Sequence, residues 1–147
     1  MLNRWLHDGT IRVLPEVESW MQALDVCARP LLDADIITAD YVTAIKQQHD
    51  RLGPYYVLAP GLAMPHARPE EGAQGLGLSL LKLEKGVSFN SEDNDPVDLI
   101  IMLAATDSHS HIETISALAE LFSSDEDMAL LHKAKNVEGI KTIINRY

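Results

Sequence analysis

Val97-Asp-Leu-Ile-Ile-Met-Leu-Ala104 forms an apolar run that is interrupted only by Asp98. Such a run, without alternation, is typical of a strand that is buried on both faces. A second strand is predicted over residues 76–83 and a third over residues 55–59, while Ile11–Leu14 forms a short strand or an extended arm. We therefore place Val97–Ala104 at the centre of a sheet that is covered on both faces.

Two helices are predicted before the central strands. Ser19 offers an N-cap to the first, and Pro30 predicts a kink or a break in it because proline removes a backbone donor. Asp40 precedes a second helix over residues 41–48, which Gly53-Pro54 ends. This part of the chain is therefore expected to be largely helical.

Helical spacing returns after the apolar strand. Apolar residues recur at helical intervals from Ile112 onward, and Ser110 with Glu113 makes a capping-box pattern. Residues 125–134 and 137–145 form two more predicted helices. Because helices lead, strands fill the middle and helices close, we predict an α/β fold, a single-domain sandwich over residues 1–147 with a mixed β-sheet flanked by helices on both sides.

Composition excludes several classes of protein. The chain has 147 residues and a formal net charge of −10, so its surface should repel nucleic acid and anionic lipid. No segment is long and uncharged enough to cross a bilayer, and we expect a cytoplasmic protein. The single cysteine, Cys27, lies in an apolar helical pattern and is expected to be buried.

Among the six histidines, His66 has the most distinctive setting. It lies between Pro65 and Pro69 on a loop that follows an apolar strand, where a rigid scaffold can present a side chain to a partner. His111 begins a predicted helix after Val97–Ala104. If the strands before the two histidines end on the same side of the sheet, both side chains could share one crevice.

The remaining histidines receive plainer interpretations. We expect His7 and His132 to face solvent, and His49 to do the same unless it lines the site.

Two histidines at one site allow two chemistries. His66, His109 and His111 could supply three nitrogens to a metal, as in a metal-dependent hydrolase. Alternatively, one neutral imidazole could accept a phosphoryl group while the second donates a hydrogen bond to its oxygens. The glycines of residues 72–77 match neither a dinucleotide nor a nucleotide loop, so we expect no cofactor.

Gly61-Leu-Ala-Met-Pro-His-Ala-Arg-Pro-Glu-Glu-Gly72 resembles the phosphorylation segment of the mannitol/fructose-type IIA domains of the bacterial phosphotransferase system (PTS). Gly53-Pro-Tyr-Tyr-Val-Leu-Ala-Pro60, Asp93-Asn-Asp-Pro-Val-Asp98 and the Ser-His-Ile segment at 110–112 follow in the family's order. The resemblance covers nearly the whole chain and is closest to the ascorbate-type and cryptic mannitol-type branch.

The resemblance implies a phosphoryl relay. In this family the IIA domain accepts phosphate from the phosphocarrier protein HPr and passes it to a cysteine on a IIB domain, which phosphorylates the entering sugar. His66 matches the phosphorylated histidine, modified on Nε2, and His111 matches the second histidine of the site. The family's upstream arginine has no clear match, so we assign its charge to Arg68. A regulatory relay without sugar transport is the alternative within the family.

Overall fold

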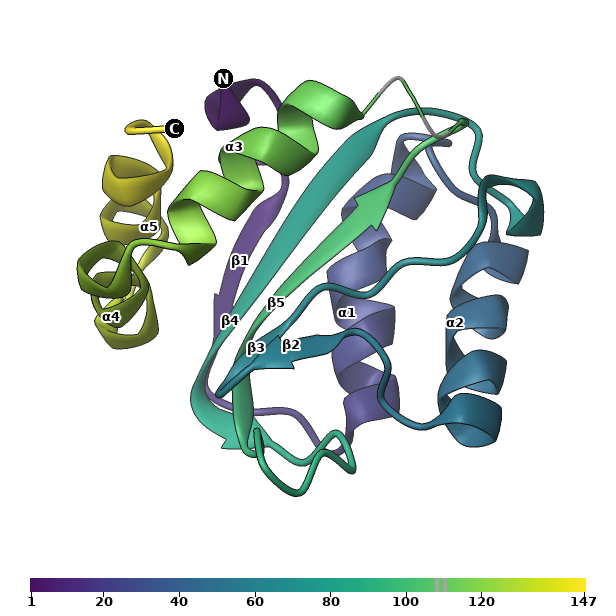
Figure 1. Cartoon of the computed structure of the whole chain (residues 1–147), viewed down its shortest axis with the longest axis horizontal. Helices are drawn as coiled ribbons and strands as arrows, with labels where there is room; N and C mark the ends of the chain where they lie inside the picture. Colours follow the sequence, from purple (N-terminus) through teal and green to yellow (C-terminus); the bar gives the residue numbers. More distant parts are fainter. Residues whose placement is uncertain (108, 110) are drawn as a thin grey trace.

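The protein is described by a computed structural model covering residues 1–107, 109 and 111–147. Its sheet has five strands in the order β1-β4-β5-β3-β2, so β5 is the central strand, as predicted (Figure 1). The strands are β1 (Ile11–Leu14), β2 (Val57–Ala59), β3 (Leu62–Ala63), β4 (Gly77–Val87) and β5 (Val97–Ala104).

The sheet is mixed. β1 runs parallel to β4 and β3 parallel to β5, whereas β4 pairs with β5 and β2 with β3 in antiparallel fashion. Gly61, with φ 76°, lies in the turn between β2 and β3, where a left-handed conformation favours glycine. β4 extends four residues beyond the predicted end at residue 83 because its antiparallel pairing with β5 resumes at Val87.

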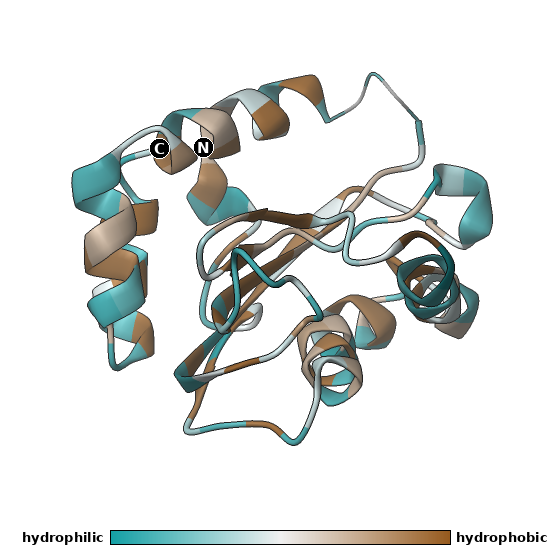
Figure 2. Ribbon diagram, turned by 60° about the horizontal axis from the view of Figure 1, so that its bottom comes forward, coloured by the Kyte–Doolittle hydropathy of each residue, from teal (hydrophilic) through white to brown (hydrophobic). Residues whose placement is uncertain are grey.

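Helices cover both faces of the sheet. α1 (Trp20–Asp33) and α2 (Ala39–Leu52) lie on one face, and α3 (Ile112–Phe122), α4 (Asp125–Lys133) and α5 (Val137–Ile144) lie on the other (Figures 1 and 2). Two short 3₁₀ helices, η1 (Leu2–Arg4) and η2 (Pro69–Glu71), complete the elements. The predicted α/β sandwich is confirmed.

The two-residue period of β5 explains why the sheet needs cover on both sides. Ile100 and Met102 belong to the core cluster under α1 and α2, whereas Leu99, Ile101 and Leu103 belong to the cluster under α3, α4 and α5. All five side chains are buried. Each buried side chain of this size stabilises the fold by roughly 1.5–3 kcal/mol relative to exposure. Because successive apolar side chains of β5 point to opposite faces of the sheet, both faces gain from cover by helices.

The helix boundaries refine the sequence predictions. Ser19 caps α1, and its side chain accepts a hydrogen bond from the backbone N–H of Gln22. The break expected at Pro30 is wrong, because the helix continues to Asp33. The proline removes one backbone donor, and the turn after it still closes, with the N–H of Ala34 donating to the carbonyl of Pro30 at 3.2 Å. α2 begins at Ala39, with Thr38 as its N-cap, so Asp40 lies in the first turn instead of preceding the helix.

At the start of α3 the N-cap position is occupied by His111. The predicted capping box involves Ser110, which lies outside the described residues.

The two ends of the chain meet. The terminal ammonium of Met1 and the backbone N–H of Leu2 both donate to the carbonyl of Tyr147, and Figure 1 shows the termini side by side. In the part of the chain that the structure describes, no helix has the length and apolar character needed to span a bilayer.

Candidate functional site

The ends of β3 and β5 bring the two candidate histidines to one edge of the sheet. The two strands are parallel, so the segments that follow them leave the sheet in the same direction. The pairing continues past β3, where the backbone N–H of Leu103 donates to the carbonyl of Pro65 at 3.1 Å. The short strand β3, not the predicted strand at residues 55–59, therefore leads directly into His66.

His66 and His111 line the same small hollow. Its volume is about 170 Å³, and its other lining residues are Tyr41, Ala67, Pro69, Leu103, Ala105 and Asp107. The expectation that the two histidines share one crevice is confirmed.

The imidazole of His66 is held through one nitrogen. Its Nδ1 lies 2.8 Å from the carbonyl oxygen of Met64. Because a carbonyl oxygen only accepts hydrogen bonds, Nδ1 carries the hydrogen. In the neutral ring the lone pair is then on Nε2, the nitrogen that a nucleophilic histidine uses in this tautomer.

Two tyrosines support the loop that carries His66. The hydroxyl of Tyr55 donates to the carbonyl of His66, and the two rings meet edge to face at 5.7 Å. The hydroxyl of Tyr41 donates to the carbonyl of Leu103 at 2.8 Å and accepts from the backbone N–H of Ala67 at 3.0 Å. These bonds link the His66 loop to α2 and to the end of β5.

Both tyrosines are protonated donors at neutral pH. Burial raises the pKa of Tyr41 above its ordinary value. Burial, with smaller contributions from Tyr41 and Glu71, raises the pKa of Tyr55 to about 12. Sequence reasoning missed both residues, although a tyrosine in an apolar stretch often places its hydroxyl against a polar partner.

His111 is oriented in a similar way to His66. Its Nδ1 lies 3.1 Å from the carbonyl oxygen of Asp107 and therefore donates, which leaves Nε2 as the second ring nitrogen. The next residue in the sequence, Ile112, is a large apolar residue that is 56% exposed. Leu62, four residues before His66, is buried in the core.

Arg68 is exposed and does not line the hollow. Within the described residues its side chain forms no ion pair, so the surface pairing with a neighbouring glutamate that its sequence context suggests is not observed. Arg68 is therefore a free cation two residues after His66. Its role stays a prediction.

The described residues contain no group of three or more histidine, cysteine or acidic side chains arranged to hold a metal. His109 does not line the hollow, and its backbone N–H donates to Oδ1 of Asp107 at 2.7 Å. The site therefore pairs two histidines from two loops.

The other histidines correct two predictions. His7 is exposed, as expected. His49 is 3% exposed, not solvent-facing: it stacks on Trp20 with ring centroids 3.7 Å apart and bonds the hydroxyl of Tyr56 at 2.7 Å. His132 is only partly exposed, because its Nδ1 turns inward to the carboxylate of Asp98.

Cys27 is buried, as predicted. Burial raises the pKa of its thiol to about 11, so it is not an activated nucleophile.

Comparison with known proteins places this site in a family. Residues 4–147 match the family described as phosphoenolpyruvate-dependent sugar phosphotransferase system, EIIA 2. An ascorbate-specific PTS EIIA component from Shigella flexneri is 40% identical, with 96% of each chain covered. A mannitol-specific cryptic phosphotransferase enzyme IIA component from Escherichia coli K12 is 42% identical over 99% of this chain and 98% of its own.

The solved structures agree. The solution structure of the mannitol-specific cryptic enzyme IIA from Escherichia coli superposes with a TM-score of 0.92, at 41% identity and 99% coverage of both chains. A complex of enzyme IIA and phosphorylated enzyme IIB of the mannitol system shares the fold, with a TM-score of 0.81 at 20% identity and 97% of this chain covered.

The chain therefore belongs to the EIIA 2 family of the phosphoenolpyruvate-dependent sugar phosphotransferase system. The EIIA components of this system are phosphotransferase components, and the relatives above are specific for ascorbate or mannitol.

Proposed function

We propose that His66 accepts a phosphoryl group from phospho-HPr on Nε2 and passes it to a cysteine of a IIB component. The observation that carries this proposal is the hydrogen bond from Nδ1 of His66 to the carbonyl of Met64, which leaves the lone pair on Nε2. In the first step this lone pair forms the N–P bond as the bond to the donor breaks. In the second step a IIB thiolate forms an S–P bond and the N–P bond of His66 breaks.

The two steps require positioning and charge stabilisation more than covalent chemistry by the protein. His111 lines the same hollow, and in its protonated form its Nε2 can donate to the phosphoryl oxygens. Arg68 is close in sequence and forms no ion pair with a described carboxylate, so its positive charge is available near His66. We assign both residues to stabilising the transferred group.

The size of the hollow supports a relay in preference to sugar binding. Sites that enclose small organic molecules usually have volumes of roughly 300–1,000 Å³, and this one has about 170 Å³. It can hold a phosphoryl group between two partners, but it offers little room for a hexitol. Exposed Ile112 beside His111 gives a partner an apolar contact at the same place.

The names of the relatives guide the biological assignment. We propose that the relay serves uptake and phosphorylation of ascorbate, mannitol or a related sugar or polyol. The IIB acceptor accords with the solved IIA–IIB complex that shares this fold. The scheme places the protein in the cytoplasm, on the side of the membrane where phosphoenolpyruvate is available.

Labelled phosphoenolpyruvate with Enzyme I and HPr tests the proposal. The native protein should gain acid-labile, base-stable label, His66→Ala should gain none, and exposed His7→Ala should behave as the native protein. Adding a IIB component should then move the label to the IIB cysteine. Label that stays on the IIA chain in the presence of IIB would favour a regulatory relay, and no label on the native protein would contradict the proposal.

A further inference from the structure

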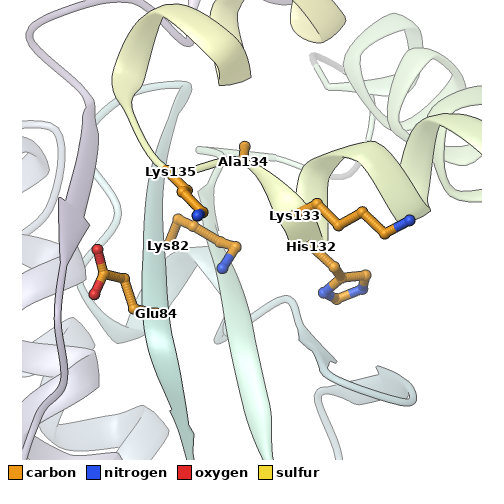
Figure 3. A pocket seen from close by; sticks show the side chains of 6 residues that line it. All are labelled: Lys82, Glu84, His132, Lys133, Ala134 and Lys135. Atoms are coloured by element: carbon orange, nitrogen blue, oxygen red, sulfur yellow. The ribbon is translucent and has the colours of Figure 1, made fainter.

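A second and larger hollow lies near the opposite end of β5 from His66. Its volume is about 560 Å³, and it is lined by Lys82, Glu84, His132, Lys133, Ala134 and Lys135 (Figure 3). Lys82 of β4 pairs with Leu99 near the start of β5, whereas the His66 hollow includes Leu103 and Ala105 near its end. At about 3.3 Å per residue, the two hollows are separated by roughly 13–20 Å along the strand.

One of the residues that line this hollow is a buried lysine. Lys82 is 3% exposed, and its ammonium lies 3.1 Å from Oδ2 of Asp98 and donates to the carbonyl of Leu83 at 2.6 Å. Asp98 also accepts from Nδ1 of His132, at 2.8 and 3.0 Å. Lys82, Asp98 and His132 thus form a continuous chain from β4 through β5 to α4, and Nε2 of His132 is not used by it.

Gly61 makes this chain possible. A Cβ atom at that position would lie 2.8 Å from Oδ1 of Asp98 and 3.0 Å from Cε1 of His132. The absence of a side chain at Gly61 lets the carboxylate and the imidazole approach each other across the β2–β3 turn.

The Lys82–Asp98–His132 interactions anchor α4 to the sheet, but they do not account for the other two lysines that line the hollow. In the described structure, Lys46, Lys82, Lys85 and Lys141 each pair with a carboxylate. Lys133 and Lys135 have no such partner among the described residues, and both line this hollow. In a protein with 22 acidic residues against 12 lysines and arginines, two unpaired lysines at one place are unexpected.

The one acidic residue of the lining does not neutralise them. Glu84 forms no ion pair in the described structure, and Figure 3 shows its carboxylate directed away from the ammonium of Lys82. With Lys82 balanced by Asp98, the hollow keeps a positive charge from Lys133 and Lys135 after Glu84 is counted. Figure 3 also shows Lys82 and Lys135 on one side of the hollow and His132 on the other, with the side chain of Lys133 extending away from them.

We propose that this hollow binds a small phosphate-bearing anion, at a site separate from the His66 relay. Lysine ammonium groups bind phosphate oxygens as point charges, and an imidazole adds a directional donor when it is protonated. The volume lies within the range of small-molecule sites. The ligand class is therefore a phosphorylated small molecule with room for an organic part beside the phosphate. The proposal does not depend on the function of His66.

Titration of the ¹⁵N-labelled protein with inorganic phosphate, at constant ionic strength set with sodium chloride, tests the site by amide NMR. Saturable shifts are expected at residues 132–135 and at Lys82. The double variant Lys133→Gln/Lys135→Gln changes two exposed side chains and should weaken this binding at least ten-fold. Lys85→Gln, an exposed lysine on the same strand that pairs with Glu16, is the matched control and should leave binding unchanged.

A titration with glycerol 3-phosphate then separates free phosphate from phosphate esters. Tighter saturation by the ester at the same residues supports a phosphorylated metabolite. Shifts that do not saturate, that persist in the double variant, or that occur only around His66 and His111 would overturn the proposal.

Discussion

His66 and His132 lie towards opposite ends of β5, and each is held through Nδ1, but by different partners. His66 donates to the carbonyl of Met64, two residues earlier in the same loop. His132 donates to the carboxylate of Asp98, 34 positions away, which also binds buried Lys82. A local bond to a neutral oxygen orients a ring, whereas a long-range bond to a shared carboxylate fastens a helix to a sheet.

The comparison predicts that function and stability can be separated along this strand. Changes to His66 and His111 themselves should alter the phosphoryl transfer rate with little change in the free energy of unfolding. Changes in the Lys82–Asp98–His132 chain should do the reverse.

After the complete loss expected for His66→Ala, the largest effect is expected for His111→Ala. Removing one preorganised donor to a developing charge typically slows a reaction by roughly 10²-fold or more, so label should still reach His66 but about 100-fold more slowly. Rapid-quench measurement of transfer from phospho-HPr checks this. His109→Ala, on the same loop but outside the hollow, is the control. A normal rate for His111→Ala would remove this residue from the mechanism.

Asp98→Asn should lower the stability of the fold and leave the phosphoryl transfer rate nearly unchanged. It leaves the charge of Lys82 buried without its counter-ion, and loss of one partner of a buried ion pair costs roughly 3 kcal/mol or more. Urea unfolding measures the loss, with exposed Asp93→Asn as the control. The phosphoryl transfer rate of the folded variant should stay within about two-fold of the native rate. A stable but inactive Asp98→Asn protein would show that the two ends are coupled.

Tyr41→Phe should affect both properties, because the hydroxyl of Tyr41 joins the His66 loop to the end of β5. It leaves the N–H of Ala67 and the carbonyl of Leu103 without this partner, at a cost of about 1–2 kcal/mol. Transfer to His66 should slow several-fold as the loop loosens. Urea unfolding and transfer rates measure the two effects together, and Tyr147→Phe, which loses a bond to Asp127, should lower stability without slowing transfer.

Arg68→Ala should have the smallest effect. Exposed charge interactions contribute roughly 0.2–1 kcal/mol, so we expect the transfer rate to fall by about two- to five-fold, more at low salt than at high salt. Exposed Arg12→Ala controls for the change in net charge. If the rate is unaffected at low salt, the positive charge at the site comes from elsewhere.

The fold was readable from the sequence because β5 is a continuous apolar run and the helices around it have clear apolar periods. The position of His66 was also readable, since Pro65 and Pro69 confine its loop. The tautomer of His66 was not, because it depends on where the carbonyl of Met64 points.

The bonded series Lys82–Asp98–His132 could not be predicted in the same way. Lys82 reaches Asp98 only because the register pairs Lys82 with Leu99, and register is set by the whole sheet. The burial of His49 could have been foreseen: it follows Tyr41 and Ile45 at intervals of four residues, which places it on the buried face of α2.

The most direct test of the central claim is the position of the phosphoryl group on the protein itself. Phosphorylated protein labelled with ¹⁵N in histidine can be examined by NMR that correlates the ring nitrogens with ³¹P. The hydrogen bond from Nδ1 to Met64 predicts a single phosphohistidine, on Nε2 of His66. Phosphate on Nδ1 of His66, or on another histidine, would contradict the account.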